Sequence, residues 1–163
     1  MSGCSPPLGQ EGQNTAVFTR LLDASATGSL ELFDELCGPR YRYHSAGFAE
    51  PLTCQEHKQS IRTIHAAFSD YEQRLDDVFG AGDRVVFRMT VTATHSGEFL
   101  GIPATGNRVR YRVLGIVRIA NGVMLDAWID QDWPTLFDQI GTTPRAWHGR
   151  WVDRLFDPLP PDP

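Results

Sequence analysis

Lysine is almost absent from this chain, because Lys58 is the only one and the other fourteen basic residues are arginines. Twenty acidic residues outweigh them, so the formal net charge is -5. No basic patch interleaved with aromatic side chains occurs, which is the pattern typical of nucleic-acid binding. We therefore expect no nucleic-acid partner.

Long apolar runs are also absent, since the longest contain only a few residues. The sequence therefore predicts neither a membrane span nor the apolar region of a signal peptide, and we expect a cytoplasmic protein.

Cysteine is scarce: Cys4, Cys37 and Cys54 are odd in number and show no CxxC spacing, so we interpret them as reduced thiols.

Motifs for cofactors and metals are missing as well. The chain has no Gly-rich phosphate loop, no nucleotide fingerprint and no Ser-His-Asp order. His57, His65 and His148 show no ligand spacing with a carboxylate or a cysteine, so no metal site is predicted. The simplest hypothesis is cofactor-free chemistry.

What is present fits one ordinary domain, with 163 residues, 41% hydrophobic and 21% charged. We expect a flexible leader over residues 1–13, one domain over residues 14–141, and an extension over residues 142–163 that ends in a Pro-rich tail. Within the extension, Trp147, Trp151 and Leu155 recur every four residues, which favours a short helix.

Helical patterns occupy the first part of the domain. Apolar spacing predicts helices over residues 14–24 and 29–37, followed by a short strand over residues 40–44. A third helix opens at Thr53, where Thr53-x-x-Glu56 has the form of a capping box. Ile61, Ile64, His65 and Phe68 form the apolar stripe of that helix.

Period-two patterns follow, over residues 71–79, 84–95, 108–119 and 123–129. Residues 80–83 and the Asn121-Gly122 pair are hairpin turn signals. No crossover helices separate these strands, so the fold class is α+β with a mainly antiparallel sheet. Strands this long curl, which leaves either a pocket or a packed core on the concave face. A last short helix is expected over residues 133–140.

Two runs carry a resemblance to a known family: residues 82–88 (GDRVVFR) and residues 94–106 (THSGEFLGIPATG). With Tyr43-His44, Asn121-Gly122 and Trp128-x-x-x-Asp132, in this order, they resemble the SnoaL-like polyketide cyclases of the nuclear transport factor 2-like superfamily. The resemblance covers residues 14–141. It implies a cone-shaped α+β barrel, in which helices close a strongly bent sheet around an apolar cavity.

The resemblance also implies a function. Relatives include intramolecular aldol cyclases of aromatic polyketides, isomerases, epoxide hydrolases and non-catalytic binding members. We predict a cyclase that acts on a polyketide-like small molecule, by proton transfer or by holding a flexible chain in a reactive fold. A hydrolase or isomerase of a small apolar substrate and a ligand-binding accessory protein are the alternatives. The resemblance further implies a homodimer.

Asp130 and Asp132 are the candidate catalytic residues, because they share the strand parity of Trp128, which would line the cavity. Desolvation in an apolar cavity makes a carboxyl group a useful acid or base near neutral pH. The resemblance implies an aspartate on the final strand in this role. The alternative is that Asp132 only caps the last helix and that Asp130 lies at the surface. His44, at the end of the first strand, is the third candidate for proton transfer.

Further residues are candidates for binding. His95 lies in the turn after its strand, where its expected task is to fasten the loop by hydrogen bonds. Arg88 and Arg112 are the arginines that could point inward, where each would need a carboxylate partner. The candidate apolar walls are Tyr43, Phe48, Phe68, Phe87, Met89, Tyr111 and Trp128.

Overall fold

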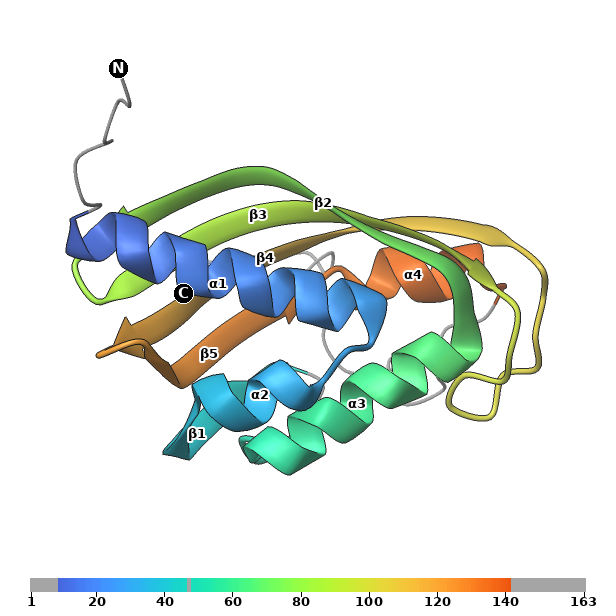
Figure 1. The fold of residues 1–163 in the computed structure, drawn as a ribbon. Helices are drawn as coiled ribbons and strands as arrows, with labels where there is room; N and C mark the ends of the chain where they lie inside the picture. The colour runs from blue at the N-terminus through green and yellow to red at the C-terminus, as the bar shows by residue number, and fades with distance from the viewer. Residues whose placement is uncertain (1–8, 47, 142–163) are drawn as a thin grey trace, which may run out of the picture.

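The computed structural model describes residues 9–46 and 48–141. Over these residues the chain forms an α+β fold in which helices pack on one curved sheet (Figure 1). The helices are α1 (Gln10–Thr27), α2 (Glu31–Leu36), α3 (Cys54–Ala67) and α4 (Trp133–Gln139). The strands are β1 (Cys37–His44), β2 (Phe68–Ala81), β3 (Arg84–His95), β4 (Arg108–Ala120) and β5 (Val123–Gln131). The predicted fold class is confirmed.

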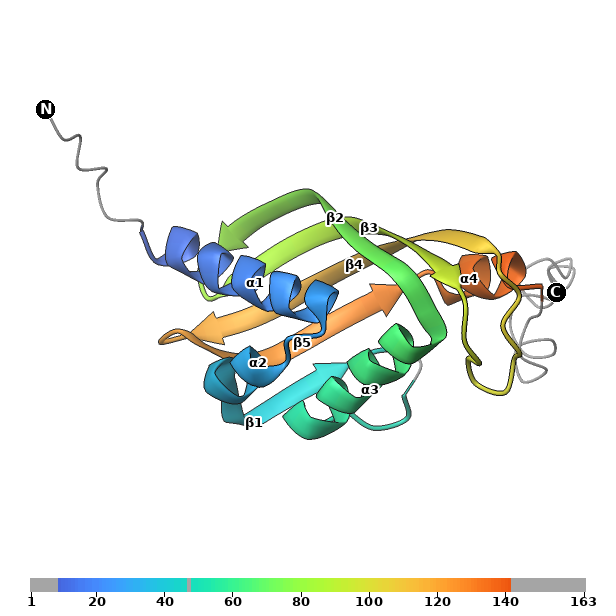
Figure 2. The same cartoon turned by 45° about the vertical axis from the view of Figure 1, so that its right-hand side comes forward.

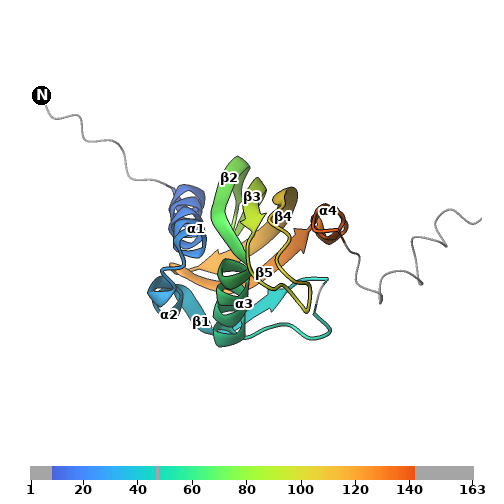
Figure 3. The same ribbon diagram turned by 90° about the vertical axis from the view of Figure 1, so that its right-hand side faces the viewer.

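The sheet has the strand order β1-β5-β4-β3-β2. All neighbouring strands are antiparallel except β1 and β5, which are parallel, so the sheet is mixed. Figures 2 and 3 show α1, α2 and α3 on the same side of the bent sheet, and α4 near one end, where it contacts β4. The space between the three helices and the concave face of the sheet is where a cavity can form.

Local signals in the sequence explain several boundaries. Thr53 and Glu56 form the predicted capping box at the start of α3, where Thr53 N donates to Glu56 Oε2 at 2.8 Å. Asn121 and Gly122 connect β4 to β5 with φ angles of 53° and 78°. Positive φ at both positions is the requirement of a tight hairpin turn, which Asn-Gly meets at low cost.

Three elements begin earlier than the sequence pattern indicates, one of them β2, which starts at Phe68 rather than at residue 71. The first helix starts at Gln10, so residues 10–13 of the predicted leader are helical. Tertiary bonds hold this turn: Gly82 N donates to Glu11 Oε1 at 2.9 Å, and the Asn14 amide donates to the Ile119 carbonyl at 3.3 Å. The strand β1 starts at Cys37 rather than at residue 40, because it pairs in parallel with β5. The predicted extension over residues 142–163 lies outside the described residues.

Gly115 on β4 shows how closely the inner face is packed. A Cβ atom at this position would lie 2.6 Å from Ile129 Cδ1 and 2.7 Å from the Phe87 ring. Any side chain here would therefore displace its neighbours.

None of the helices in the described ranges has the length and hydropathy of a membrane-spanning segment.

Candidate functional site

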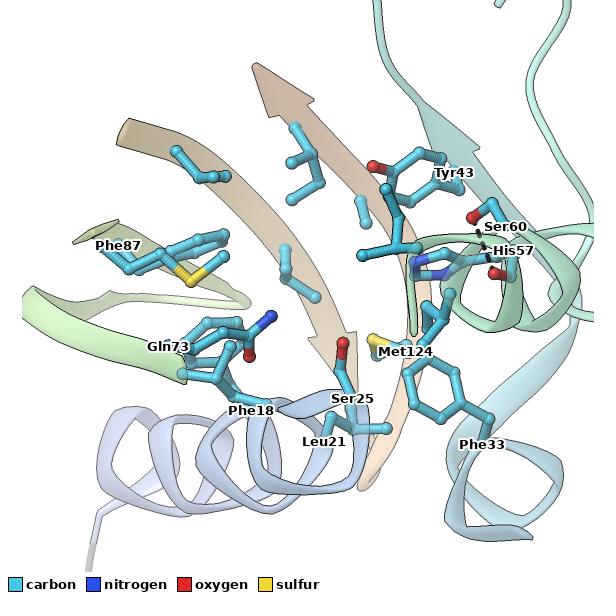
Figure 4. A pocket seen from close by; sticks show the side chains of 18 of the residues that line it. Phe18, Leu21, Ser25, Phe33, Tyr43, His57, Ser60, Gln73, Phe87 and Met124 are labelled. Carbon is cyan, nitrogen blue, oxygen red and sulfur yellow. Dashed lines mark hydrogen bonds between the residues drawn. The ribbon is translucent and has the colours of Figure 1, made fainter. Parts of the chain in front are cut away.

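An inner cavity of about 120 Å³ lies between the concave face of the sheet and the helices α1 and α3 (Figure 4). Much of its wall is apolar, including Phe18, Leu21, Phe33, Phe87, Met89 and Met124. A second set of lining residues is polar, namely Ser25, Tyr41, Tyr43, His57, Ser60, His65, Tyr71, Gln73 and Gln131. The cavity therefore combines an apolar wall with a few polar groups, as small-molecule sites do.

An outer pocket of about 500 Å³ adjoins this cavity. It is lined by Phe48, Leu52, Phe99, Leu100, Trp133 and Phe137, together with polar residues of α3. Four residues line both spaces: Tyr43, Ser60, Ile64 and Gln131. We call these four residues the neck. One long hydrogen bond crosses it, from Gln131 Nε2 to the Tyr43 hydroxyl at 3.4 Å.

His57 is a titratable side chain of the inner cavity whose position is fixed by its contacts with neighbouring residues. It projects from α3, and its ring stacks on Tyr43 with 4.0 Å between ring centroids. Its Nδ1 atom lies 3.0 Å from the hydroxyl of Tyr41. Desolvation by the surrounding protein lowers the pKa of His57 to about 4. The imidazole is therefore neutral at neutral pH, with one nitrogen able to accept a proton.

The tyrosines around His57 remain protonated. Burial raises the pKa of Tyr41 well above its usual value and that of Tyr43 to about 12. Tyr71 also has a raised pKa because of burial, and its hydroxyl accepts a hydrogen bond from Gln73 Nε2 at 3.2 Å. The cavity thus holds neutral hydroxyl groups that can donate to an oxygen of a ligand.

Carboxylates are missing from the inner cavity, as far as the described residues are concerned. Glu56 lines the outer pocket, but its Oε2 atom already accepts hydrogen bonds from Thr53 in the capping box. Two histidines, His57 and His65, line the inner cavity. His65 Nε2 donates to the Ser25 carbonyl at 2.8 Å, which leaves His57 as the candidate base.

The predicted parity of β5 is wrong. Ala127, Ile129 and Gln131 line the inner cavity, whereas Trp128 is 38% exposed and Asp130 is exposed on the opposite face. Trp128 pairs there with Ile116 of β4, which is 37% exposed. The cause is a register shift at the Arg118 and Ile119 positions of β4, because an extra residue on β5 reverses which side chains face inward.

Asp132 does not line either space. It is the N-cap of α4, where its carboxylate accepts from Thr135 N at 3.3 Å. The alternative reading of Asp132 as a cap is therefore confirmed. The acidic residue that the resemblance implies for the final strand does not point into the cavity, because no inward position of β5 is acidic.

His44 also lies on the convex face rather than at the cavity. Its ring stacks on Trp128 with 5.2 Å between centroids, and its Nε2 atom lies 3.5 Å from Asp126 Oδ1. The inward positions of β1 are Tyr41 and Tyr43, which alternate with Arg42 and His44. The expectation that His44 reaches the cavity is wrong for this reason.

Arg88 and Arg112 point outward as well. Arg88 is exposed and its Nη2 atom lies 2.6 Å from Asp77 Oδ2 on the neighbouring strand β2. Arg112 is exposed, and no residue of either pocket wall is an arginine within the described chain. An inward arginine would have needed a buried carboxylate partner, which this cavity does not offer.

The remaining candidates are divided among three places. Phe87, Met89 and Tyr43 line the inner cavity, and Phe48 lines the outer pocket. Phe68 and Tyr111 are buried in the core next to these spaces. His95 fastens its loop, because its Nδ1 atom lies 3.0 Å from Thr105 Oγ1 and its backbone pairs with residues 106 and 107. Their roles in binding stay predictions.

Sequence reasoning missed the residues that the cavity brings together, namely His57, Tyr41, Gln73 and Gln131. One signal could have found His57, because it precedes Ile61 by four residues and so extends the apolar stripe of α3. Alternation with Tyr43 places Tyr41 on the same face of β1. Gln131 gave no such signal, since its inward position depends on the register shift in β5.

Across residues 9–46 and 48–141, no group of three or more His, Cys, Asp or Glu side chains is arranged to hold a metal ion. Cys37 and Cys54 are free. Burial raises the pKa of both thiols, which keeps them protonated and poorly nucleophilic.

Comparison with known proteins gives the context for this site. The aklanonic acid methyl ester cyclase DnrD of Streptomyces peucetius is 29% identical over 129 residues, which span 74% of this chain and 75% of that protein. The structure of IdmH, a candidate polyketide cyclase from Streptomyces antibioticus, is 28% identical with a TM-score of 0.71, covering 80% of this chain and 99% of that chain.

Two further structures share the fold. TsrD from Streptomyces laurentii has a TM-score of 0.72 and 26% identity, covering 84% of this chain and 100% of that one. AclR from Streptomyces galilaeus, a candidate hydroxylase, has a TM-score of 0.74 and 24% identity over 83% of this chain and 100% of that one. A family model described as SnoaL-like polyketide cyclase matches residues 15–140. The chain therefore belongs to the SnoaL-like polyketide cyclase family, with the nuclear transport factor 2-like fold.

Proposed function

We propose that this protein is a cyclase that closes a ring within a polyketide-type intermediate by intramolecular aldol addition, with His57 as the base. The observation that carries the proposal is the neutral imidazole of His57, which lies in a largely apolar cavity and contacts the Tyr41 hydroxyl at 3.0 Å. Its pKa of about 4 keeps the ring unprotonated at neutral pH, and a base this weak requires neighbouring donors that stabilise the enolate oxygen.

The contact with Tyr41 is compatible with either tautomer, because a tyrosine hydroxyl both donates and accepts, and we assign the tautomer that can act as a base. When Nδ1 carries the proton and donates it to the Tyr41 oxygen, the lone pair of Nε2 is free to accept a proton from the substrate. Tyr41 is 2% exposed, so its position is fixed by the packing around it. Stacking on Tyr43 further restricts the plane of the imidazole ring. Tyr41 and Tyr43 thus act as positioning residues for His57.

The imidazole and the substrate supply every proton that the reaction requires. Nε2 takes a proton from a carbon next to a carbonyl group of the substrate, which leaves an enolate. The enolate carbon attacks a ketone carbon of the same molecule, so a carbon–carbon bond forms and the carbonyl π bond breaks. The resulting alkoxide takes the proton back from the imidazolium. No redox equivalent is required, and the product is an isomer of the substrate.

Neutral donors at the neck are placed to stabilise the enolate oxygen. The hydroxyl of Tyr43 keeps its proton, because its pKa is about 12. Gln131 already donates to that hydroxyl, which leaves the Tyr43 proton available to a ligand. Donors in an apolar site are more effective than the same groups in water. Confinement between the apolar walls contributes further by holding the two reacting carbons together.

Aklanonic acid methyl ester is the first substrate to test, because the relative from Streptomyces peucetius is named as its cyclase. The purified protein should convert it to a product of the same mass with a different retention time, measured by liquid chromatography with mass spectrometry. Styrene oxide, offered in parallel, should remain unchanged. A diol from styrene oxide, one water heavier, together with unchanged aklanonic acid methyl ester would refute the cyclase proposal in favour of an epoxide hydrolase.

A further inference from the structure

Two cysteine thiols lie in contact where β1 and α3 begin. Cys37 is the first residue of β1, Cys54 is the first residue of α3, and both line a third pocket, of about 280 Å³. The two thiols are hydrogen-bonded to each other. Cys54 donates its own proton to the Phe33 carbonyl, with 3.6 Å between Sγ and oxygen. Cys37 is therefore the donor in the bond between the thiols.

The surroundings of Cys54 favour a thiolate more than those of Cys37 do. Cys54 opens the 14-residue helix α3, where backbone N–H groups without helical partners favour a negative charge. Burial raises the pKa of Cys54, but the hydrogen bond from Cys37 and the Lys58 ammonium act against this rise, whereas Asp34 adds to it. For Cys37, burial and the bond to Cys54 both raise the pKa. Cys54 is therefore the better nucleophile of the pair.

The position of the pair also differs from that of thiols that only fill a core. Both side chains are partly exposed, so a small reagent can reach them from the third pocket. Lys58, the only lysine of the chain, is 5% exposed, and its Nζ atom lies 2.6 Å from Asp34 Oδ2. A cation close to a pair of contacting thiols is an arrangement that promotes thiol exchange.

We propose that Cys37 and Cys54 form a reversible disulfide by exchange with a small disulfide such as oxidised glutathione. The sulfur of Cys54 attacks one sulfur of the reagent, whose S–S bond breaks, and one glutathione leaves with the proton of Cys54. The sulfur of Cys37 then attacks Cys54 Sγ, and the second glutathione leaves with the proton of Cys37. Two protein thiols are oxidised, and one reagent disulfide is reduced to two thiols.

The new bond would cross-link the two elements that meet at the candidate base. Tyr41 follows Cys37 on β1, and His57 follows Cys54 on α3, which runs beside β1 in the fold (Figure 1). The bond closes a loop over residues 37–54, and such a loop restricts the unfolded chain more than the folded one. We therefore expect the oxidised protein to be the more stable form.

Mass spectrometry of the full chain tests whether the bond forms. The protein carries Cys4→Ser, so that Cys37 and Cys54 are its only thiols. After overnight incubation with excess oxidised glutathione and alkylation in urea, the chain should have lost two hydrogen atoms and carry no adduct. A tryptic digest without reductant should join peptides 21–40 and 43–58, and dithiothreitol should separate them. Two alkylated thiols, or glutathione retained on either cysteine, would overturn the proposal.

Urea denaturation of the same protein tests whether the folded state accommodates the bond. The oxidised form should unfold at a midpoint about 1–2 M higher than the form treated with dithiothreitol. An equal or lower midpoint would overturn a disulfide that fits the native fold. Neither measurement requires turnover, so both are independent of the cyclisation assay.

Two single variants in the Cys4→Ser background test the order of attack and serve as controls for each other. Cys37→Ser should hold glutathione on Cys54 as a mixed disulfide, because the second thiol that would release it is gone. Cys54→Ser should bind about tenfold less glutathione, since Cys37 is the less reactive thiol. The opposite preference would overturn the assignment of Cys54 as the attacking thiol.

Discussion

Protonation of His57 should destabilise the fold in a defined pH range. The pKa of this side chain is about 4 in the folded protein because of desolvation, against an ordinary value of 6.5. A group with a lowered folded pKa binds its proton more readily in the unfolded chain. For a histidine, the unfolded state then gains protons first as the pH falls below 6.5, so stability decreases from there toward pH 4.

The size of the effect follows from the two pKa values. A difference between 6.5 and about 4 is worth at most about 3 kcal/mol in the free energy of unfolding, of which about 2 kcal/mol is lost between pH 7 and pH 5. Carboxylates contribute at lower pH. Hydrogen bonds from Thr90 and Arg118 lower the pKa values of Asp76 and Asp83 below 3.8. The stabilisation that these two carboxylates contribute is therefore lost only as the pH falls below about 3.8.

Urea denaturation at pH 7 and at pH 5 measures this loss, with His57→Asn as the comparison. Asparagine keeps a polar atom near the Nδ1 position for Tyr41 but does not titrate. His95, whose pKa burial also lowers, is present in both proteins and cancels in the difference. The unmutated protein should lose about 2 kcal/mol more than the variant. Equal losses in the two proteins would refute a neutral, desolvated His57.

The remaining predictions concern three other places in the fold. Tyr41→Phe should lower kcat for ring closure about tenfold with KM unchanged, because His57 loses the hydrogen bond at Nδ1 that positions its ring; an unchanged kcat would contradict this role. Asp132→Ala should cost about 1 kcal/mol in urea denaturation, because α4 loses its cap, and a cost no larger than that of Asp130→Ala would contradict it. We expect a homodimer that pairs through the convex face, so Ile116→Arg should shift the mass measured by light scattering to that of a monomer, and an unchanged mass would exclude this pairing.

Most of the fold could be predicted from local chemistry. The strand over residues 84–95 has the predicted bounds, because its period-two pattern runs without interruption between two turn signals. The capping box places the start of α3 correctly for a similar reason. Bounds set by distant partners could not be predicted. The early start of α1 depends on Glu11 and Asn14 bonding to the ends of distant strands.

The candidate site was harder to predict than the fold, because it depends on side-chain direction. Trp128 is large and apolar, which favoured an inward position, yet a shift of register in β5 turns it outward with Asp130. A one-residue change in register moves every following side chain to the other face. Although His57 follows the helical stripe of α3, only the structure brings Tyr41 within 3.0 Å of it.

The catalytic role of His57 is the central claim, and the rate of ring closure in variants tests it most directly. With aklanonic acid methyl ester as substrate, His57→Asn should lower kcat about 10²- to 10⁴-fold, which is the usual contribution of a positioned base. Asp130→Asn and Asp132→Asn, whose side chains lie outside the cavity, should keep kcat within about threefold of the unmutated protein, less than the loss of one hydrogen bond. An undiminished rate in His57→Asn, or a large loss in either aspartate variant, would contradict the account.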